Sequence, residues 1–427
     1  MELKKYKLGE IVKLHTITIS PNSGTIYKLY SLPSFDNGMQ CEIVDGNYIQ
    51  SNKFSVPNKC ILFNKLNVRF KRVWRISNVD TNKLCSTEFL PLIVDENIAD
   101  YQYLYYLLIS DGITNYLCGQ NTNTSGSHKR IDPNDFLNIN VFLPSKSTQK
   151  QIGKLLSDID NKINLNHALN QNLEAMAKQL YDYWFVQFDF PDENGRPYKS
   201  SGEKMVWNDK LKREIPKGWE AAKLDNLFQV VADKAKKMDI QHLLYAPIEV
   251  LPRKQMSFYD TAPIENAVSG LCKFKKGNIL LSNRRVYFHK VCIAPFDGVT
   301  RDTVIVLKTL NENTFGFDYQ IVNSEHFISY ATRFSYGSEQ PVFSWQDAKN
   351  YYYAKPNNGI AEIYSNCVAP LINKVLEVQN ELRELTKQRD ELLPLLMNCE
   401  ILVNSDLAAS LMLKIMVIHS NIATGHK

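Results

Sequence analysis

Hydrophobic residues recur at alternating spacings of four and three in two long stretches of the chain, residues 148–187 and 358–397. In the first stretch they are Leu169, Leu173, Met176, Leu180 and Tyr183. In the second they are Leu371, Val375, Val378, Leu382, Leu385 and Leu392. This heptad spacing predicts two long coiled-coil helices, because it places the apolar side chains along one helix face. An ordinary amphipathic core helix is the alternative for each stretch.

Polar residues and prolines interrupt these two apolar faces at a few positions. Asn166 falls on the face of the first stretch and Arg389 on that of the second. A buried polar residue on such a face can fix the register of a helix pair. Pro370 predicts that the regular part of the second helix starts there, and Pro394 predicts its end or a kink.

The rest of the chain shows the shorter patterns of strands and small helices. β-Branched and aromatic runs separated by Gly, Asn, Pro and Asp fill residues 1–147 and 215–357, as is typical of strands. Residues 101–109 and 317–330 are predicted as helices. Each region is therefore expected to be a mixed α/β module, and the fold class is α+β.

The two mixed regions are similar in sequence, so the chain contains an internal repeat. Lys7-Leu8-Gly9-Glu10 matches Lys223-Leu224-Asp225-Asn226, 216 residues later, just after the turn IPKGW. Residues 61–69 match residues 279–287 at an offset of 218, and the helical stretches match at an offset of 209. The predicted layout is a domain at 1–147, a helix at 148–187, a linker at 188–214, a second domain at 215–357, a second helix at 358–397 and a tail at 398–427.

The two helices are expected to pack antiparallel, which would relate the repeats by a two-fold axis. About 35 helical residues span roughly 50 Å, so the pair would separate two similar domains.

Composition narrows the class of protein without naming a function. The 427 residues are 44% hydrophobic and 22% charged, with a formal net charge of +5, which is ordinary for a globular protein. The eight cysteines form no CxxC motif, so buried, reduced thiols are expected and no metal site. The N-terminus has no apolar signal core and no apolar stretch is long enough for a membrane span. We expect a cytoplasmic protein without a membrane partner.

Basic residues gather at corresponding places in the two repeats, with aromatic residues between them. Alternation along a strand would place many of these charges on one face, which suits DNA phosphates. The small polar loop at 121–130, with its counterpart at 335–341, suits phosphates and base edges. A solvated surface is the alternative reading of each cluster and loop. The candidate DNA-binding residues are Lys65, Asn67, Arg69, Lys71, Arg72, Ser125, Ser127, Lys129, Arg130, Asn283, Arg284, Arg285, Lys290, Ser338 and Gln340.

The whole arrangement resembles the specificity subunits of type I restriction-modification systems. The resemblance covers about residues 1–400 and is carried by IPKGWE, GNILLS, CILFNKLN, QKQIGKLLSDIDNKINLN, LYDYWFVQFDFP and LLPLLMN. It implies that each repeat is a target recognition domain for one half of a split sequence in double-stranded DNA. It also implies that the helices set the spacer and dock two modification (methyltransferase) subunits, and that the complex recruits the restriction (motor-nuclease) subunit. The tail after Glu400 does not resemble the family.

The sequence contains no recognisable catalytic motif. An Asn-Pro-Pro-Tyr-like tetrapeptide, a Gly-rich cofactor loop, GxxxxGK followed by Ser or Thr, and HExxH are all missing. The pair Asp192-Glu193 lies in a turn-rich stretch and does not form a nuclease motif. We therefore expect a non-catalytic subunit without a cofactor. The alternatives are a coiled-coil adaptor that does not bind DNA, and a self-contained methyltransferase or nuclease.

Overall fold

The computed structural model describes residues 2–120, 129–236, 240–268, 270–357 and 359–398. These residues form two compact units. Unit 1 is built from the described residues of 1–162 and 387–427, and unit 2 from those of 163–386. The two long helices contribute to both units.

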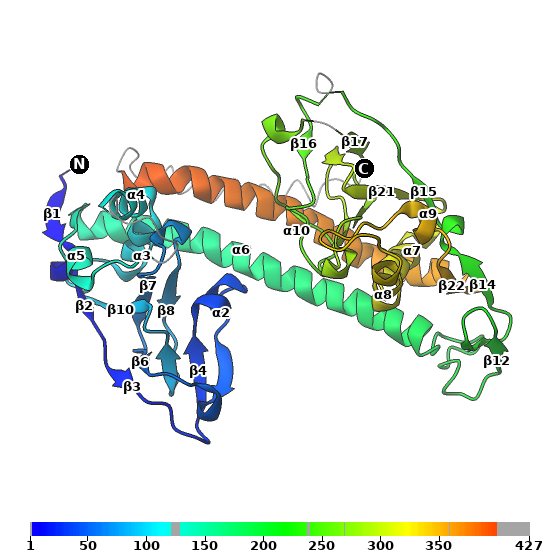
Figure 1. Ribbon diagram of the computed structural model, residues 1–427, viewed down its shortest axis with the longest axis horizontal. Helices are drawn as coiled ribbons and strands as arrows, with labels where there is room; N and C mark the ends of the chain where they lie inside the picture. Colours follow the sequence, from blue (N-terminus) through cyan, green and yellow to red (C-terminus); the bar gives the residue numbers. More distant parts are fainter. Residues whose placement is uncertain (1, 121–128, 237–239, 269, 358, 399–427) are drawn as a thin grey trace. The chain divides into compact units, whose positions relative to one another are not determined.

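Unit 1 begins with a mixed domain of short strands and helices (Figure 1). Its strands are β1 (Lys4–Lys7), β2 (Val12–Leu14), β3 (Thr18–Ile19), β4 (Ile26–Tyr30), β5 (Glu42–Asp45), β6 (Lys53–Ser55), β7 (Cys60–Asn64), β8 (Val73–Ile76), β9 (Lys83–Cys85), β10 (Phe89–Val94) and β11 (Asn140–Leu143). Its helices are α1 (Leu8–Ile11), α2 (Leu32–Asp36), η1 (Gly46–Tyr48), η2 (Val68–Phe70), α3 (Tyr101–Ile109), α4 (Asp111–Gln120) and α5 (Pro133–Leu137).

Unit 2 contains a second mixed domain of short strands and helices. Its strands are β12 (Met205–Asn208), β13 (Arg213–Pro216), β14 (Glu220–Lys223), β15 (Phe228–Val230), β16 (Leu244–Tyr245), β17 (Leu271–Phe274), β18 (Ile279–Ser282), β19 (Val291–Ile293), β20 (Gly298–Arg301), β21 (Val304–Thr309) and β22 (Tyr352–Lys355). Its helices are η3 (Asp182–Val186), η4 (Leu224–Asn226), η6 (Ile264–Asn266), η7 (Val286–Phe288), η8 (Glu312–Thr314), α7 (Phe315–Val322), α8 (Glu325–Arg333) and α9 (Trp345–Ala348).

The sheets of the two units have matching strand orders, which is a structural test of the repeat. The order β2-β10-β7-β8 in unit 1 corresponds to β15-β21-β18-β19 in unit 2, and the pair β1-β11 corresponds to β14-β22. In both units a parallel pair, β4 with β9 and β16 with β20, belongs to a second sheet. The predicted duplication of a mixed α/β domain is therefore present in the fold.

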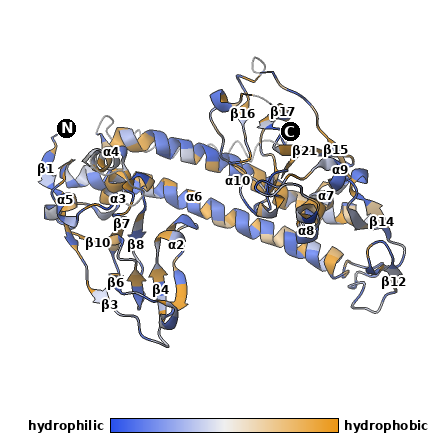
Figure 2. Ribbon diagram, in the orientation of Figure 1, coloured by the Kyte–Doolittle hydropathy of each residue, from blue (hydrophilic) through white to orange (hydrophobic). Residues whose placement is uncertain are grey.

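The two long helices are α6 (Lys146–Tyr181), of 36 residues, and α10 (Ile360–Met397), of 38 residues. Figure 2 shows hydrophobic and hydrophilic residues alternating along both of them. Within unit 2 the helices run antiparallel, because Asn166 contacts Glu381 while Ala177 accepts a hydrogen bond from Tyr364. Within unit 1, Asp160 of α6 contacts Arg389 of α10 at 3.5 Å.

One prediction about the second helix was wrong. Pro370 does not start its regular part, because α10 begins at Ile360 and passes through Pro370. Pro394 does not end α10, which continues to Met397, and the alternative of a kink at Pro394 stays a prediction. A proline removes one backbone donor and crowds the preceding turn, and here packing against the core of unit 2 by Tyr364, Val368 and Ile372 holds the helix together.

The residues expected to form a linker, 188–214, have a structure of their own in unit 2. They contain β12 and the start of β13, which pair antiparallel. Phe188 and Phe190 are buried, and the ring of Phe190 stacks on that of Trp219 with 5.0 Å between centroids. Trp219 belongs to the IPKGW turn, so this turn anchors the hairpin to the core.

The cysteines only partly follow the expectation of buried thiols. Cys60, Cys85 and Cys292 are buried, whereas Cys118 and Cys367 are exposed. Within the part of the chain that the structure describes, all cysteines are free. The same part contains no helix that is both long and apolar enough to cross a membrane.

Candidate nucleic-acid interface

Three chain segments of unit 1 meet beside the end of strand β7 and form a small backbone platform. The Lys65 N–H donates to the carbonyl oxygen of Glu88, and the Ile131 N–H donates to that of Lys65, both at 2.9 Å. The Asn67 N–H donates to the carbonyl oxygen of Lys129, also at 2.9 Å. We call residues 65–67, 88 and 129–131 the platform of unit 1.

Unit 2 builds the same platform from equivalent residues. The Asn283 N–H donates to Thr303 O at 3.0 Å, and the Phe343 N–H donates to Asn283 O at 2.9 Å. The Arg285 N–H donates to Pro341 O at 2.9 Å. Residues 283–285, 303 and 341–343 are the platform of unit 2. The backbone is thus shared, and the side chains on it differ.

A short 3₁₀-helix follows each platform, and a left-handed residue stands on either side of it. Asn67 (φ 52°) and Lys71 (φ 30°) flank η2, while Arg285 (φ 46°) and His289 (φ 53°) flank η7. Residues with a Cβ seldom adopt this backbone. The same two positions have this backbone in two different sequences, so the turn is a shared feature of the repeat.

This geometry corrects the expected placement of the basic clusters. The residues from Lys65 to Arg72 do not alternate along a strand, because they form the connection between β7 and β8. Arg284 and Arg285 likewise lie in the connection between β18 and β19. The left-handed residues turn the chain out of the sheet, so the basic side chains belong to a loop beside the sheet rather than to one of its faces.

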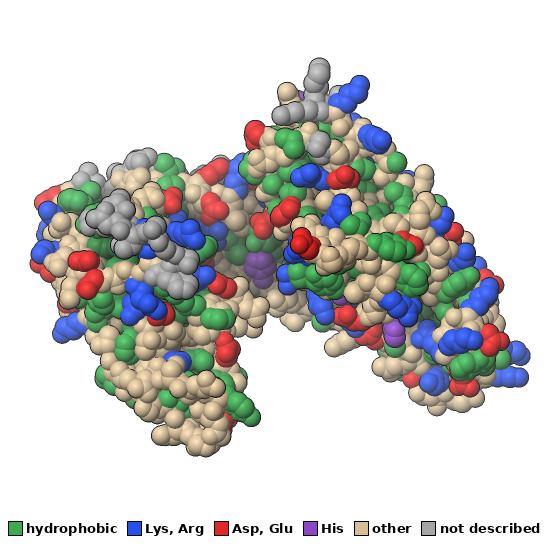
Figure 3. All heavy atoms as spheres, viewed as in Figure 1, with side chains coloured by type: hydrophobic (Ala, Val, Ile, Leu, Met, Phe, Trp, Pro, Cys, Tyr) green, Lys and Arg blue, Asp and Glu red, His purple; other side chains and the backbone are tan. Residues whose placement is uncertain are grey.

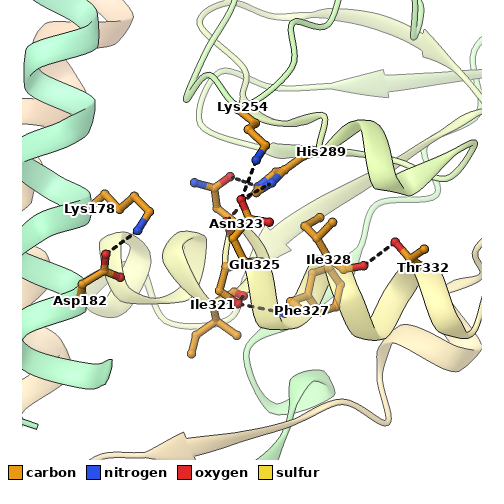
Figure 4. A network of polar contacts seen from close by, with 11 residues as sticks. Lys178, Asp182, Lys254, His289, Ile321, Asn323, Glu325, Phe327, Ile328 and Thr332 are labelled. Carbon is orange, nitrogen blue, oxygen red and sulfur yellow. Dashed lines mark hydrogen bonds and ion pairs between the residues drawn. The ribbon is translucent and has the colours of Figure 1, made fainter. Parts of the chain in front are cut away.

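The second left-handed residue of each turn lies close to the first residue of a later helix. In unit 1 the Lys71 Nζ lies 2.5 Å from Asp111 Oδ1, at the start of α4. In unit 2 the His289 Nδ1 lies 3.5 Å from Glu325 Oε1, at the start of α8 (Figure 4). Figure 4 also shows Lys254 bound to the same carboxylate, at 2.8 Å. This hydrogen bond lowers the pKa of Glu325.

His289 is buried and held on its other side as well. Its Nε2 lies 3.0 Å from both the backbone oxygen and the side-chain oxygen of Asn323. The imidazole therefore fixes the turn to the end of α7, which is a structural task. Arg285, four residues earlier, is half-buried, and Tyr287 between them is exposed.

Three of the predicted basic residues in unit 1 are neutralised by carboxylates within the same unit. The pairs are Lys71 with Asp111, Arg72 with Asp36, and Arg130 with Glu88. The last two are bidentate, with bonds of 2.7 to 3.1 Å. The Arg72 hydrogen bonds lower the pKa of Asp36, and the Glu88 hydrogen bonds raise the pKa of Arg130. Sequence reasoning missed Asp36 and Glu88, because each is distant along the chain from its partner.

The remaining basic residues of unit 1 are placed differently. Arg69 is exposed, and its guanidinium lies 4.8 Å from the centroid of the Phe70 ring. Lys65 and Lys129 are half-buried on the platform itself. Among the described residues no carboxylate pairs with Arg69 or Lys65. Ser125 and Ser127 lie outside the described residues.

In unit 2 the predicted residues divide in a similar way. Lys290 is half-buried and donates to Ile248 O at 2.6 Å, and burial lowers its pKa. Asn283 donates through Nδ2 to Asp302 O at 2.8 Å. Arg284 and Arg285 are half-buried on the platform, whereas Ser338 and Gln340 are exposed between α8 and α9.

The face of the molecule seen in Figure 3 is not uniformly basic. Figure 3 shows Lys and Arg side chains interspersed with Asp and Glu on the face in view. A polyanion would therefore be bound by a few placed cations and polar groups rather than by a broad positive field. Arg130 and Val342 occupy equivalent places after the two predicted loops, since Leu66 bridges to Arg130 and Arg284 to Val342. Residues 121–128 lie outside the described residues, so the correspondence of the loops themselves stays a prediction.

Comparison with known proteins gives consistent matches. Residues 1–175 match the family model described as "Type I restriction modification DNA specificity domain". The chain is 24% identical over 340 residues to the type I restriction enzyme MjaIX specificity subunit of Methanocaldococcus jannaschii, covering 75% of this chain and 74% of that protein. It is 30% identical over 152 residues to the HindI specificity subunit of Haemophilus influenzae, covering 35% and 33%.

A solved structure has the same fold. The crystal structure of the type I restriction-modification system S subunit from M. genitalium superposes with a TM-score of 0.58 at 14% identity, covering 93% of this chain and 96% of that one. At this identity the likeness concerns the fold. The order of two repeated domains and two long helices is therefore an arrangement that a known protein shares.

Proposed function

We propose, on the premise that this chain is a type I restriction-modification specificity subunit, that each of its two repeats recognises one half of a bipartite DNA target. The observation that carries the proposal is the pair of platforms. The same backbone hydrogen bonds present different side chains in the two units: Lys65 against Asn283, Asn67 against Arg285, and Glu88 against Thr303. Two equivalent surfaces with different chemistry suit an asymmetric pair of half-sites.

The recognition domains in this proposal are residues 1–147 and 215–357, and the platforms with their turns face DNA. Exposed cations without a carboxylate partner, such as Arg69, bind phosphates, and side chains of the platforms contact base edges. The proposed DNA-binding residues are Lys65, Asn67, Arg69, Lys71, Arg72, Ser125, Ser127, Lys129, Arg130, Asn283, Arg284, Arg285, Lys290, Ser338 and Gln340. Within this set, Lys71, Arg72 and Arg130 act mainly by holding the turn in place, because each is bound to a carboxylate.

The long helices set the spacer between the half-sites in this proposal. Each is one uninterrupted helix of more than 35 residues, which corresponds to about 54 Å at 1.5 Å per residue. One turn of DNA is about 34 Å long, so a gap of several base pairs between half-sites is of the right order. The same helices offer docking surface for two modification subunits, and the complex recruits the restriction subunit.

In this proposal the chain supplies recognition and assembly, and the chemistry belongs to its partner subunits. It needs no cofactor of its own and acts on the DNA of the host, in the cytoplasm. A coiled-coil adaptor that does not bind DNA is not favoured, because the matched family is described as a DNA specificity domain.

Sequencing of methylated bases tests the proposal directly. Genomic DNA is compared between the host strain and the same strain without this gene, and a complementing plasmid restores the gene as control. The expected result is one bipartite methylated motif that disappears on deletion and returns on complementation. If every methylated motif survives deletion, the proposal is wrong.

A further inference from the structure

Asn67 and Arg285 occupy the same place in the two repeats. Each precedes the 3₁₀-helix of its turn and has a left-handed backbone, with φ of 52° and 46°. The carbonyl oxygen of each accepts a hydrogen bond from the last residue of that helix, Phe70 at 3.1 Å and Phe288 at 2.9 Å. The backbone therefore presents the two side chains in the same way.

The backbone explains the choice of residue in unit 1 but not in unit 2. Left-handed backbone is least unfavourable for Gly, Asn and Asp, whose side chains are absent or short. Asn67 suits its position for this reason alone. Arg285 does not, because an Asn or a Gly would stabilise the same turn better. Strained residues of this kind concentrate at functional sites, so the guanidinium requires an explanation outside the backbone.

The surroundings of Arg285 leave its polar atoms unused. Its Nε is buried and has no hydrogen-bond partner, and no carboxylate contacts its guanidinium, as far as the described residues extend. The neighbouring Asn283 Oδ1 and Thr303 Oγ1 also lack partners there. Buried polar atoms without partners are uncommon in folded proteins. In unit 1 the residue equivalent to Thr303 is Glu88, whose carboxylate binds Arg130, whereas Thr303 brings no carboxylate to the platform of unit 2.

We infer that the position shared by Asn67 and Arg285 is the main base-recognising position of each repeat, with Asn67 contacting adenine and Arg285 contacting guanine. The inference rests on the proposed function and names the residue that selects a base in each half-site. The amide of Asn offers one donor and one acceptor, which match N6 and N7 of adenine in the major groove. The guanidinium of Arg offers two donors, which match O6 and N7 of guanine.

The substitution Arg285→Asn tests the inference without threatening the fold, because Asn is favoured at a left-handed position. The chain is co-expressed with its modification subunits, and the methylated motif is sequenced. We expect one position of one half-site to lose its preference for guanine and to gain adenine, with a change in preference of about 5- to 150-fold. The other half-site and the spacer stay unchanged. Asn67→Arg is expected to change one position of the other half-site from a preference for adenine to a preference for guanine.

Lys212→Ala is the matched control. Lys212 is also left-handed, with φ of 52°, and exposed, but it lies between β12 and β13, away from the platforms. The methylated DNA motif obtained with Lys212→Ala is expected to equal that of the unmodified chain. If Arg285→Asn abolishes methylation, binding of the purified complex to duplexes with each of the four base pairs at every half-site position gives the same comparison.

Three results overturn the inference while leaving the proposed function intact. They are an unchanged motif with Arg285→Asn, a change in both half-sites, and a unit 2 half-site without any G·C pair. The failure of the proposed function looks different, since then no methylated motif depends on this chain at all.

Discussion

Asn166 donates a hydrogen bond from its Nδ2 to Glu381 Oε2 at 2.9 Å, although the two residues are 215 positions apart in the sequence. Both are buried, with exposed fractions of 3% and 8%, between α6 and α10 in unit 2. Asn166 is the polar residue that the sequence places on the apolar face of the first helix, whereas its partner Glu381 was not predicted. This hydrogen bond joins two helices that also meet through hydrophobic side chains and through the hydrogen bond from Tyr364 to Ala177 O.

Replacing one partner of this pair is expected to destabilise unit 2. Asn166→Leu removes a donor from a buried carboxylate, and we expect the free energy of unfolding in urea to fall by about 2–3 kcal/mol. The double variant Asn166→Leu with Glu381→Leu removes both polar groups and is expected to recover most of that loss. A double variant as unstable as the single one would contradict this account.

The buried carboxyl of Asp318 makes stability depend on pH. Asp318 is fully buried and accepts hydrogen bonds from the hydroxyls of Thr309 and Thr314. Burial raises its pKa to about 7, and the two hydrogen bonds only partly oppose this. The folded state thus binds a proton more tightly than the unfolded state, so stability is expected to fall as pH rises from about 4 to about 7. Asp318→Asn should remove this slope and raise the free energy of unfolding at pH 8 by about 2 kcal/mol.

Asp297→Asn is the control, because the carboxyl of Asp297 is expected to change stability with pH in the opposite direction to that of Asp318. Its carboxylate accepts hydrogen bonds from Lys275 Nζ and Lys276 N, which lower its pKa. That stabilisation is present above the unfolded pKa and is lost as pH falls, so the substitution should lower the melting temperature at pH 7 and have little effect near pH 3. Equal pH profiles for the two variants would show that these carboxyls do not govern the dependence.

Substitutions at Arg69 and Arg72 are expected to distinguish a contribution to DNA binding from a contribution to fold stability. Both guanidiniums lie 4.8 Å from the Phe70 centroid, but only Arg72 is bound to a carboxylate, that of Asp36. Arg69→Gln is expected to lower the slope of log K against log salt by about 1 and to weaken binding to all sequences alike. Arg72→Gln should leave that slope unchanged and lower the melting temperature. Salt titrations of the assembled complex on labelled duplex decide the point, and equal slopes for both variants would refute it.

Shortening both helices tests their role in the spacer. Residues 163–169 and 378–384 lie opposite each other and contain Asn166 and Glu381, so deleting both heptads removes the two partners together. Seven residues correspond to about 10 Å of helix, and we expect the spacer of the methylated motif to shorten by up to about three base pairs. The half-sites should be unchanged. A shortened helix pair with an unchanged spacer would contradict the proposal.

Much of the fold was predictable because it depends on local patterns. Periodicity placed both long helices, and the offsets of 216 and 218 residues located the repeat, which the matching strand orders confirm. Asn166 could be identified as a residue that fixes the register of the helix pair, because a lone polar residue on an apolar helix face has few other roles. These features depend on the spacing of residues along the chain, which can be read directly from the sequence.

The site was harder to predict because it depends on tertiary contacts. The ion pair of Arg72 with Asp36 spans 36 residues and that of Arg130 with Glu88 spans 42, so no local pattern indicates which cations are neutralised. The left-handed backbone at Arg285 runs against the preference of arginine, and the sequence therefore predicted a strand where the chain turns. The path of α10 through Pro370 likewise depends on packing that is distant in sequence.

The division of the chain into units also fixes an order of events during synthesis. The core of unit 1 includes Leu396 and Met397, from the last turns of α10, beside Leu104 and Ile152. Roughly 230 residues separate Lys162 from Leu396, and a ribosome adds about 5–20 residues per second. The first part of unit 1, up to Lys162, is therefore made roughly 10–50 s before the final hydrophobic residues of the same unit. During that interval the nascent first domain exposes an unfilled apolar surface, and chaperones that bind such surfaces would meet it there.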